Sequence, residues 1–401
     1  MKKLLTLALA LLLIAASIPV ASLAEEPVEL VFWHYYEEGS SFSKNLQKLF
    51  DRYHEENPNV TIRMEIKQFS DLKQDLTIAA VTGGLPDLVY IDNCDTVSFA
   101  AMGILADLSD AFADYADFDD YFPAIMDCCK YDGKLYAVPA LTNAIGFYYN
   151  KDMLEEAGVD VPTNWEELRA AAKACTTDEH LGYAMCLFPD EAGTFNYLMY
   201  QLQAGGDYYN LNSEAGIKAL TFIKSLVDDG SMSKDVLTWS QRDVGRQFTS
   251  QNVAIIELGC WYIDEWEEVE GLEFGTFTTT DVCGASVYGG ENLTVVDNEN
   301  TQASIDFVKW FMQYDINKQW NLDAQHFPAR NATLTDPDYQ QNPNWKPIID
   351  QIPVTSARPA DPQWPEVSLG YQYAFTAVVT GEATPEEAAA RGQEIIDAAR
   401  Q

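Results

Sequence analysis

The chain lacks the residue patterns of common catalytic sites. It contains no G-x-S-x-G nucleophile motif, no H-E-x-x-H zinc motif and no phosphate-binding loop. Its paired glycines do not follow the dinucleotide-binding pattern, and its four histidines (34, 54, 180 and 326) are not at metal-ligand spacing. Its 62 acidic residues would supply a carboxylate pair by chance, so their number does not indicate acid–base catalysis. We therefore expect no enzyme, no cofactor and no metal site.

Aromatic residues at the ends of predicted strands suggest a binding surface instead. Trp261 follows Gly259 and Cys260, whose small size would let a ligand approach, and an indole offers a flat apolar face with one hydrogen-bond donor. Such a face stacks on the C–H side of a sugar ring while Asp, Asn and Arg bind the hydroxyls. We favour ligand contact for Trp261. Trp33, Tyr36, Phe195 and Trp239 are further candidates, with core packing as an alternative of nearly equal weight.

The first part of the chain predicts a lobe that would position some of these residues. Strands at 28–33, 60–66 and 86–91 alternate with helices at 40–53 and 71–81, the pattern of a βαβ lobe. Ligands of such sheets bind beyond the carboxyl ends of the strands. Two such ends are the segment 33–38 and the segment 92–95, which is Asp-Asn-Cys-Asp. Turn chemistry with surface charge explains these two segments equally well.

The stretch 133–176 indicates a crossing between two lobes. A strand over 133–139 ends at Pro139, which cannot donate to a central ladder, and a second strand follows at 145–149. Asn143 lies between these strands and is the polar residue expected to face the cleft. A short helix ends at Gly158, and Thr163 with Glu166 predicts a capping box for the next helix.

Later segments continue the alternation. We predict strands at 182–188 and 253–258 and helices at 194–204, 213–229, 242–250, 301–314 and 385–400. The glycine-punctuated, β-rich segment 273–294 and the loop 326–331 are candidates for a second and a third crossing. The acidic, aromatic segment 107–122 predicts a surface helix with a loop, and it lacks the glycine and spacing of a calcium-binding loop.

Composition and the N-terminal segment limit the classes of protein to which this chain can belong. At 401 residues the chain suggests two α/β lobes, and a net charge of −37 argues against nucleic acid and anionic membrane partners. We interpret this charge as a solvated acidic surface, with recognition of a cationic ligand as the alternative. Residues 1–24 have the two lysines, the apolar stretch and the small residues before Ala24 that are typical of a signal peptide. We expect cleavage near Ala24 and export to the periplasm or the cell exterior.

The cysteines predict neither a zinc site nor a complete disulfide framework. There are seven, at positions 94, 128, 129, 175, 186, 260 and 283, and none shows C-x-x-C spacing. An odd number leaves at least one unpaired. We expect buried free thiols, with one or two disulfides as the alternative.

Several motifs resemble the extracellular solute-binding proteins of ABC importers, specifically the family-1 carbohydrate-binding group. They are GGLPDLVYID (83–92), GKLYAVP (133–139), FYYNKDMLEEAGVDVPTNWEEL (147–168), FTSQNVAIIELGCW (248–261), GGENLTV (289–295) and FPARNATLTDP (327–337). The resemblance covers nearly the whole mature chain in order, and its Y-N-K-D segment is the most specific. No cysteine lies near the cleavage site to carry a lipid anchor, so the envelope type stays open.

The resemblance implies an α/β, two-lobed periplasmic-binding-protein type II fold (Venus flytrap) with three hinge crossings, near 140–143, 280–287 and 327–331. It implies a first lobe of 25–140 plus 285–328 and a second lobe of 141–284 plus 329–401. It also implies ligand contacts, which together with the candidates above are Trp33, Tyr36, Glu38, Asp92, Asn93, Asp95, Asn143, Phe195, Asn196, Trp239, Trp261, Gly289, Gly290, Glu291 and Arg330.

The function expected from this resemblance is capture of a mono- or oligosaccharide by hinge closure and delivery to an ABC permease. We expect a monomer without membrane insertion. Two alternatives remain open at this point. One is a receptor for a polyamine or another cationic solute, in which Glu38, Asp92, Asp95 and Glu291 would form an acidic pocket. The other is a secreted glycoside hydrolase.

Overall fold

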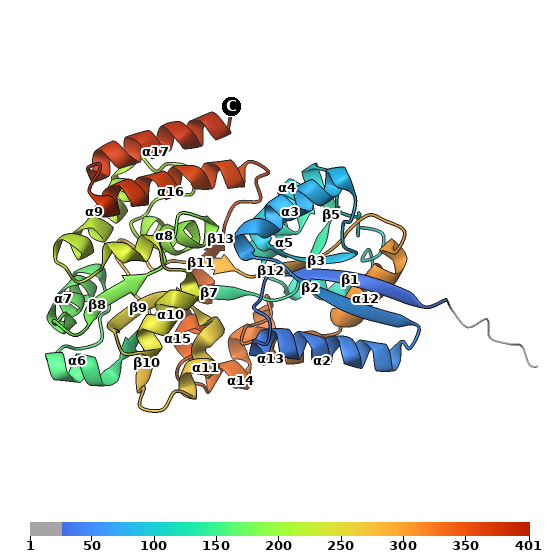
Figure 1. The fold of residues 1–401 in the computed structure, drawn as a ribbon, viewed down its shortest axis with the longest axis horizontal. Coiled ribbons are helices and arrows are strands. Elements are labelled where there is room, and N and C mark those ends of the chain that lie inside the picture. Colours follow the sequence, from blue (N-terminus) through green and yellow to red (C-terminus); the bar gives the residue numbers. More distant parts are fainter. Residues whose placement is uncertain (1–25) are drawn as a thin grey trace, which may run out of the picture.

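Two α/β lobes lie side by side in the computed structural model, which describes residues 26–401 (Figure 1). The expected signal segment 1–24 falls outside the described residues. The lobe that contains the first strands lies at the right of Figure 1, and the lobe that contains the C-terminal helices lies at the left. No helix within residues 26–401 has both the length and the apolar character that crossing a membrane requires.

The first lobe is built on a five-stranded sheet. Its strands, in spatial order, are β2 (Val60–Ile66), β1 (Val28–His34), β3 (Leu88–Asp92), β12 (Glu291–Val295) and β6 (Ala137–Pro139). Strand β1 is parallel to β2 and β3, whereas β12 is antiparallel to β3 and β6. The interior strand β12 thus comes from a segment about 200 residues later than its neighbour β3.

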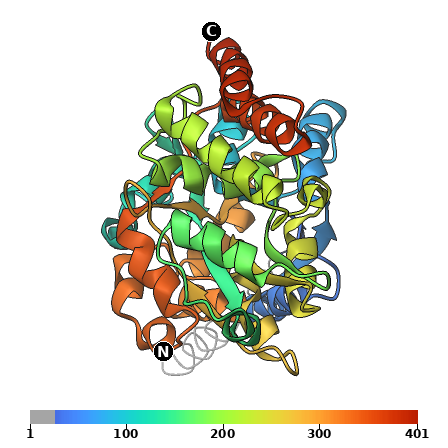
Figure 2. The same ribbon diagram turned by 90° about the vertical axis from the view of Figure 1, so that its left-hand side faces the viewer.

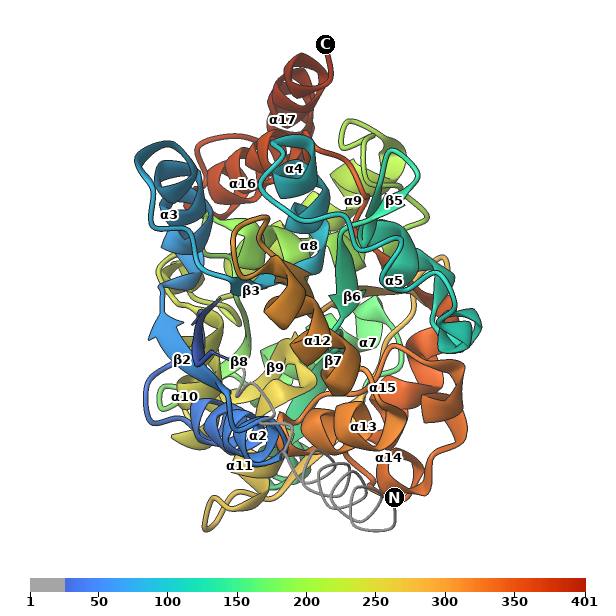
Figure 3. The same ribbon diagram turned by 90° about the vertical axis from the view of Figure 1, so that its right-hand side faces the viewer.

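Helices from the first third of the chain and from residues 301–323 cover the first sheet. They are α2 (Ser41–Glu56), α3 (Phe69–Thr82), α4 (Thr96–Ala101), α5 (Pro123–Cys128), α12 (Thr301–Phe311) and α13 (Tyr314–Asp323). Figure 3 shows α12 and α13, late in the chain, beside the N-terminal helix α2. Ser40 caps α2 by accepting a hydrogen bond from the Ser43 amide, and the apolar face predicted for this helix is buried.

The second lobe is built on a six-stranded sheet. The path β13 (Thr355–Ala357), β11 (Ser286–Gly289), β7 (Asn143–Asn150), β9 (Val253–Gly259) and β8 (Leu181–Met185) is joined by β10 (Phe274–Phe277), which pairs with β7. Its helices are α6 (Lys151–Ala157), α7 (Trp165–Cys175), α8 (Glu191–Gln203), α9 (Glu214–Asp228), α10 (Gln241–Thr249), α11 (Ile263–Glu267), α14 (Pro337–Gln340), α15 (Lys346–Gln351), α16 (Trp364–Thr380) and α17 (Pro385–Ala399). A two-stranded hairpin, β4 (Lys130–Tyr131) and β5 (Lys134–Leu135), stands apart from both sheets.

The chain passes between the lobes in three neighbouring segments. The first and third are paired, because Thr142 and Phe327 exchange backbone hydrogen bonds of 3.0 and 3.1 Å. The second turns at Gly290, whose φ of +120° suits glycine, and a Cβ there would lie 2.3 Å from the Leu141 carbonyl oxygen. Since β11 belongs to the second sheet, this crossing lies later than the lobe boundary at 285 expected from the sequence.

Two local predictions differ from the structure. The cap of α7 is Asn164, which accepts from the Glu167 amide, so the predicted box at Thr163 and Glu166 is wrong by one residue. This register makes Trp165 the first helical residue and buries its ring. Segment 107–122 forms turns and a 3-10 segment, Ala116–Asp120, instead of the predicted helix, because its aromatic side chains at 112, 121 and 122 pack into the core.

Helix α16 was not predicted at all. Its less buried face carries the apolar Leu369 and the aromatic Tyr373 among its polar residues, so the polar face by which an amphipathic helix is recognised is weak. The helix is sandwiched between α17 and the pair α8 and α9. Figure 2 shows α16 and α17, in red, along the top of the second lobe. The capping box predicted for α17 at Thr384 and Glu387 is confirmed.

The cysteines are unpaired. All seven are free thiols, six of them buried and only Cys283 exposed. This agrees with the expected buried thiols, and the alternative of one or two disulfides is not seen.

Candidate functional site

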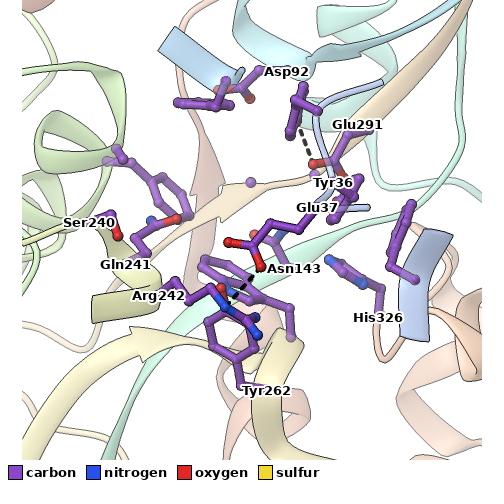
Figure 4. Close-up of a pocket in the computed structure, with 18 of the residues that line it drawn as sticks. Tyr36, Glu37, Asp92, Asn143, Ser240, Gln241, Arg242, Tyr262, Glu291 and His326 are labelled. Carbon is purple, nitrogen blue, oxygen red and sulfur yellow. Dashed lines mark hydrogen bonds and ion pairs between the residues drawn. The ribbon is translucent and has the colours of Figure 1, made fainter. Parts of the chain in front are cut away.

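A cavity of about 440 Å³ lies between the two lobes, beside the three crossings. Its lining comes from the segments that follow β1, β3, β8 and β9, from the crossing at Gly289–Glu291, and from the segment 323–326 that follows α13. These are the carboxyl ends of strands and the connections between lobes, where ligands of open α/β sheets bind. Figure 4 shows side chains of both lobes converging on this cavity.

One side of the cavity is aromatic. The Trp261 indole and the His326 imidazole are nearly parallel, with an interplanar angle of 15° and centroids 6.4 Å apart. A Cβ on Gly259 would lie 1.7 Å from the Trp261 ring. The glycine therefore makes room for the indole itself, and not for a ligand as we expected. Burial lowers the pKa of His326 to about 4, so this ring is neutral at pH 7.

The polar side of the cavity includes a contact between the lobes. Glu37, after β1, is paired with Arg242 of α10 at 3.1 Å, and Figure 4 shows these side chains meeting in the middle of the view. Arg242 also lies 3.8 Å from Glu265. Asn143 is nearly buried, and its Oδ1 has no hydrogen-bond partner among the described residues. A buried acceptor of this kind is costly unless a ligand or water donates to it.

The floor of the cavity is a buried charge network centred on Arg358. Its guanidinium donates to both carboxylate oxygens of Asp92, with Nη1 to Oδ2 at 2.9 Å and Nη2 to Oδ1 at 2.5 Å. It also donates to Glu191 Oε1 at 2.8 Å and lies 4.8 Å from the centroid of the Phe195 ring. Because Asp92 belongs to the first lobe and Arg358 to the second, this bidentate pair links the lobes.

A second acidic group lies beside this network. Tyr35 Oη donates to Glu291 Oε1 at 2.6 Å, and Glu291 is paired with Asp92 across β12 and β3. Burial raises the pKa of Glu291 to about 7, although hydrogen bonds from Tyr35 and Tyr36 oppose the shift. Glu291 therefore titrates near neutral pH.

Three potential metal ligands, Asp92, Cys94 and Asp95, lie within 4.8 Å of one another. Their carboxylates already have cationic partners, since Arg358 binds Asp92 and Lys73 Nζ lies 2.8 Å from Asp95. The cluster is thus an ion-pair network, and its residues do not present a free donor set for a metal.

Many of the residues expected to contact a ligand line the cavity. They are Tyr36, Asp92, Asn143, Phe195, Trp261, Gly289, Gly290 and Glu291. Gly289 has a clear steric role, because a Cβ there would lie 2.3 Å from Asn143 Oδ1 and 2.8 Å from the Phe195 ring. The crossing can therefore pass close to both side chains only as glycine.

Three further expected residues lie directly behind the lining. Asn93 Oδ1 accepts from Arg358 at 3.1 Å, and Asp95 binds Lys73. Asn196 accepts a hydrogen bond from Gln241, which itself lines the cavity. Each of the three thus contacts another side chain instead of the open space.

The remaining expected residues lie outside the cavity lining. Trp33 packs in the smaller hydrophobic cluster of the first lobe, with Lys67 3.8 Å above its ring. Glu38 is exposed, and Trp239 is half-buried at the edge of the main core. Arg330 donates to Asp117 at 3.0 Å and to Tyr115. Their contact with a ligand stays a prediction.

Arg358 and Arg242 are the main lining residues that sequence reasoning missed. A signal existed, because the chain has 25 basic residues against 62 acidic ones, and Arg358 follows the segment Val354-Thr355-Ser356-Ala357 directly. A cation in a loop after an apolar segment is a candidate partner for buried carboxylates. Its partners could not be identified, because Asp92 is 266 positions away.

Residues 48–347 match the family profile of the bacterial extracellular solute-binding proteins. Among curated proteins, the galactooligosaccharide-binding protein of Bacillus subtilis is 21% identical over 90% of this chain and 86% of its own length.

Solved structures give the same picture of the fold. An ABC transporter solute-binding protein of Thermotoga lettingae, bound with α-D-tagatose, matches with a TM-score of 0.85 at 23% identity, covering 93% of this chain and 100% of that chain. The cyclic α-maltosyl-1,6-maltose binding protein of Arthrobacter globiformis matches with a TM-score of 0.78 at 26% identity, covering 93% and 99%. The two-lobed fold expected from the sequence is confirmed.

Proposed function

The chain belongs to the bacterial extracellular solute-binding proteins, and we propose that it captures a neutral mono- or oligosaccharide outside the membrane and delivers it to the membrane subunits of an ABC importer. It is a binding protein and not an enzyme. The observation that carries the sugar assignment is the interlobe cavity, whose lining combines Trp261 with polar side chains of both lobes. We propose further that the protein is exported through its N-terminal segment and acts as a monomer.

The chemistry of the lining suits a carbohydrate. An indole face packs on the C–H face of a pyranose or furanose, while carboxylate, amide and guanidinium groups bind hydroxyls. Asn143 Oδ1 supplies an acceptor that has no hydrogen-bond partner within residues 26–401. The ligands named for the related proteins are a ketohexose, a cyclic tetrasaccharide and galactooligosaccharides. Similarity to these proteins therefore supports a sugar ligand but does not indicate how many sugar units it has.

Charge supports a neutral solute over the cationic alternative. The carboxylates of Asp92 and Glu191 are already paired with the Arg358 guanidinium, and Glu37 is paired with Arg242. An anionic sugar would in turn meet arginines that already pair with carboxylates, Arg358 with Asp92 and Glu191 and Arg242 with Glu37. A polyhydroxylated, uncharged molecule disturbs neither network.

Closure of the lobes provides the mechanism. The Arg358–Asp92 and Arg242–Glu37 pairs both join the lobes, so they form only when the cleft is shut. A bound sugar that contacts both lobes adds to the stability of this state. Moving the population from 1% to 99% closed requires about 5.5 kcal/mol of differential binding. A stacked ring and a few hydrogen bonds to charged groups, each about 1.5–3 kcal/mol, are sufficient.

Calorimetric titration tests the proposal. The mature protein is titrated with four sugars or sugar alcohols: D-tagatose, maltose, mannitol and a galactooligosaccharide mixture. Putrescine and spermidine are titrated in parallel to test the alternative of a cationic solute. We expect heat from at least one sugar, little dependence on salt, and no release of product from the oligosaccharides. Binding confined to the polyamines, with affinity that falls steeply as salt is added, would overturn the sugar assignment. Product release would establish a hydrolase.

A further inference from the structure

A chain of buried polar groups lies behind the cavity wall. Gln241, which lines the cavity at the start of α10, donates from Nε2 to Asn196 Oδ1 at 3.1 Å. Asn196, on α8, in turn donates from Nδ2 to Glu257 Oε1 at 2.9 Å. The series thus runs from the cavity lining into the interior of the second lobe through three side chains.

Glu257 is an unusual residue for its position. It lies within β9, its side chain is completely buried, and it forms no ion pair among the described residues. The groups beside it are the hydroxyls of Tyr183 and Tyr200, which hydrogen-bond each other, and the Cys186 thiol. Burial raises the pKa of Glu257 well above its ordinary value, against the opposing hydrogen bonds of Asn196, Tyr200 and Tyr183. Burying such an acid is costly, so its retention needs a reason.

The structure sets one consistent direction for these hydrogen bonds. The Glu257 oxygen that faces Asn196 accepts when the acid is ionised, and also when its proton lies on the other oxygen beside the tyrosine hydroxyls. In both of these states Asn196 turns its NH₂ inward and its carbonyl oxygen outward. That carbonyl can only accept, so Gln241 must use its NH₂ for this bond. The Gln241 carbonyl oxygen is then left for the cavity.

We propose that Glu257 is a positioning residue for the solute site: acting through Asn196, it holds the Gln241 amide so that the cavity wall presents Oε1 as a hydrogen-bond acceptor. This inference rests on the sugar-binding function proposed above and deepens it. The solute must donate a hydrogen bond to Gln241 Oε1, as a free sugar hydroxyl does. A sugar derivative in which this hydroxyl is removed or O-methylated binds more weakly.

Neutron crystallography of the perdeuterated protein tests the orientation without any sugar. We expect two deuterons on Gln241 Nε2, one of them directed at Asn196, and two on Asn196 Nδ2, one of them directed at Glu257. The reverse orientation of either amide would overturn the proposal.

A double-mutant cycle tests the consequence for binding, with whichever of D-tagatose or maltose binds the wild type as the probe. Glu257→Leu removes the acceptor, and we expect its affinity to fall about three- to tenfold. Glu257→Gln keeps an acceptor and a donor in the same places and should bind within about twofold of the wild type. In a Gln241→Ala background, Glu257→Leu should cause no further loss.

Two results of this cycle would contradict a positioning role. One is an equal loss from Glu257→Leu with and without Gln241, which would indicate a general effect on the lobe. The other is a Glu257→Gln variant as weak as Glu257→Leu, which would indicate that the charge itself matters. Glu268→Gln, at an exposed position of the same lobe, is the matched control. If neither probe binds the wild type but another sugar of the titration above does, that sugar becomes the probe. If none of those sugars binds, the proposed function fails while the neutron structure still decides the orientation.

Discussion

The Arg358 network offers a direct test of how closure is balanced. Replacement of Arg358 by methionine preserves much of the side-chain volume and removes four hydrogen bonds, to Asp92, Asn93 and Glu191. In the closed state, side chains that are 9% and 5% exposed, those of Asp92 and Glu191, would then lack their cation. Leaving buried charges unpaired typically costs about 3–5 kcal/mol.

The protein can avoid part of this free-energy cost if its two lobes separate. The contacts with Asp92 and Asn93 join the lobes, so separation lets Asp92 reach water, whereas Glu191 stays with Arg358 in the second lobe. We therefore expect Arg358→Met to oppose closure more than it opposes folding. A closed-state penalty of about 3 kcal/mol corresponds to an increase in Kd of more than 100-fold. Because opening relieves part of the penalty, the melting temperature should fall by less than it would if the full penalty of about 3 kcal/mol were lost from the free energy of unfolding.

Three measurements check this expectation. Calorimetry gives the Kd for the sugar, small-angle X-ray scattering gives the radius of gyration with and without sugar, and thermal denaturation gives the stability. Arg246→Met is the control, because Arg246 is 63% exposed and pairs only with Asp243 at 3.4 Å. If Arg358→Met binds sugar within about threefold of the wild type and compacts normally, the ion pair does not stabilise the closed state.

The remaining predictions concern single positions. The pKa of Glu291, raised to about 7 by burial, means that the stability contributed by its protonated form is complete below pH 4.5 and is lost as the pH rises through 7. Glu291→Gln should therefore melt like the wild type at about pH 4 and be stabilised by about 3 kcal/mol at about pH 8, and equal melting at both pH values would contradict the assigned pKa. Trp261→Ala should weaken sugar binding about tenfold in calorimetry, whereas Trp239→Phe, outside the cavity lining, should not, and equal losses would remove the case for stacking. Gly289→Ala should lose sugar affinity and about 1–3 kcal/mol of stability by thermal denaturation, while Gly284→Ala, whose Cβ would meet only ordinary contacts, should lose neither.

Features set by short-range pattern were predictable from the sequence. The strands β1, β2 and β3 and the helices α2 and α3 follow from apolar periodicity and caps, and Tyr36 and Asp92 could be placed at the cavity because they follow predicted strands. The Gly289–Glu291 segment could be identified from its paired glycines. The fold class followed from the order of these elements together with the family resemblance.

Features set by one-residue register or by distant partners were not predictable. On β1, Phe32 packs in the main hydrophobic core and Trp33 packs on the opposite face of the sheet. The four consecutive apolar residues 30–33 do not indicate which of these side chains faces which side. The counter-ion of Asp92 comes from a loop 266 positions later. No local pattern encodes such a pair, because only closure of the tertiary structure brings the two charges together.

The position of β12 has a consequence for how this chain can fold. The order of the first sheet places Glu291–Val295 between β3 and β6, so this strand fills an interior position of a sheet whose other members all precede residue 140. Until about 295 residues have left the ribosome, the first lobe lacks this interior strand, and both of its neighbours have an unpaired edge. Such long-range pairing is slow to form and high in contact order. The N-terminal lobe therefore cannot complete its fold ahead of the rest, and vectorial, lobe-by-lobe folding during synthesis is excluded by the topology.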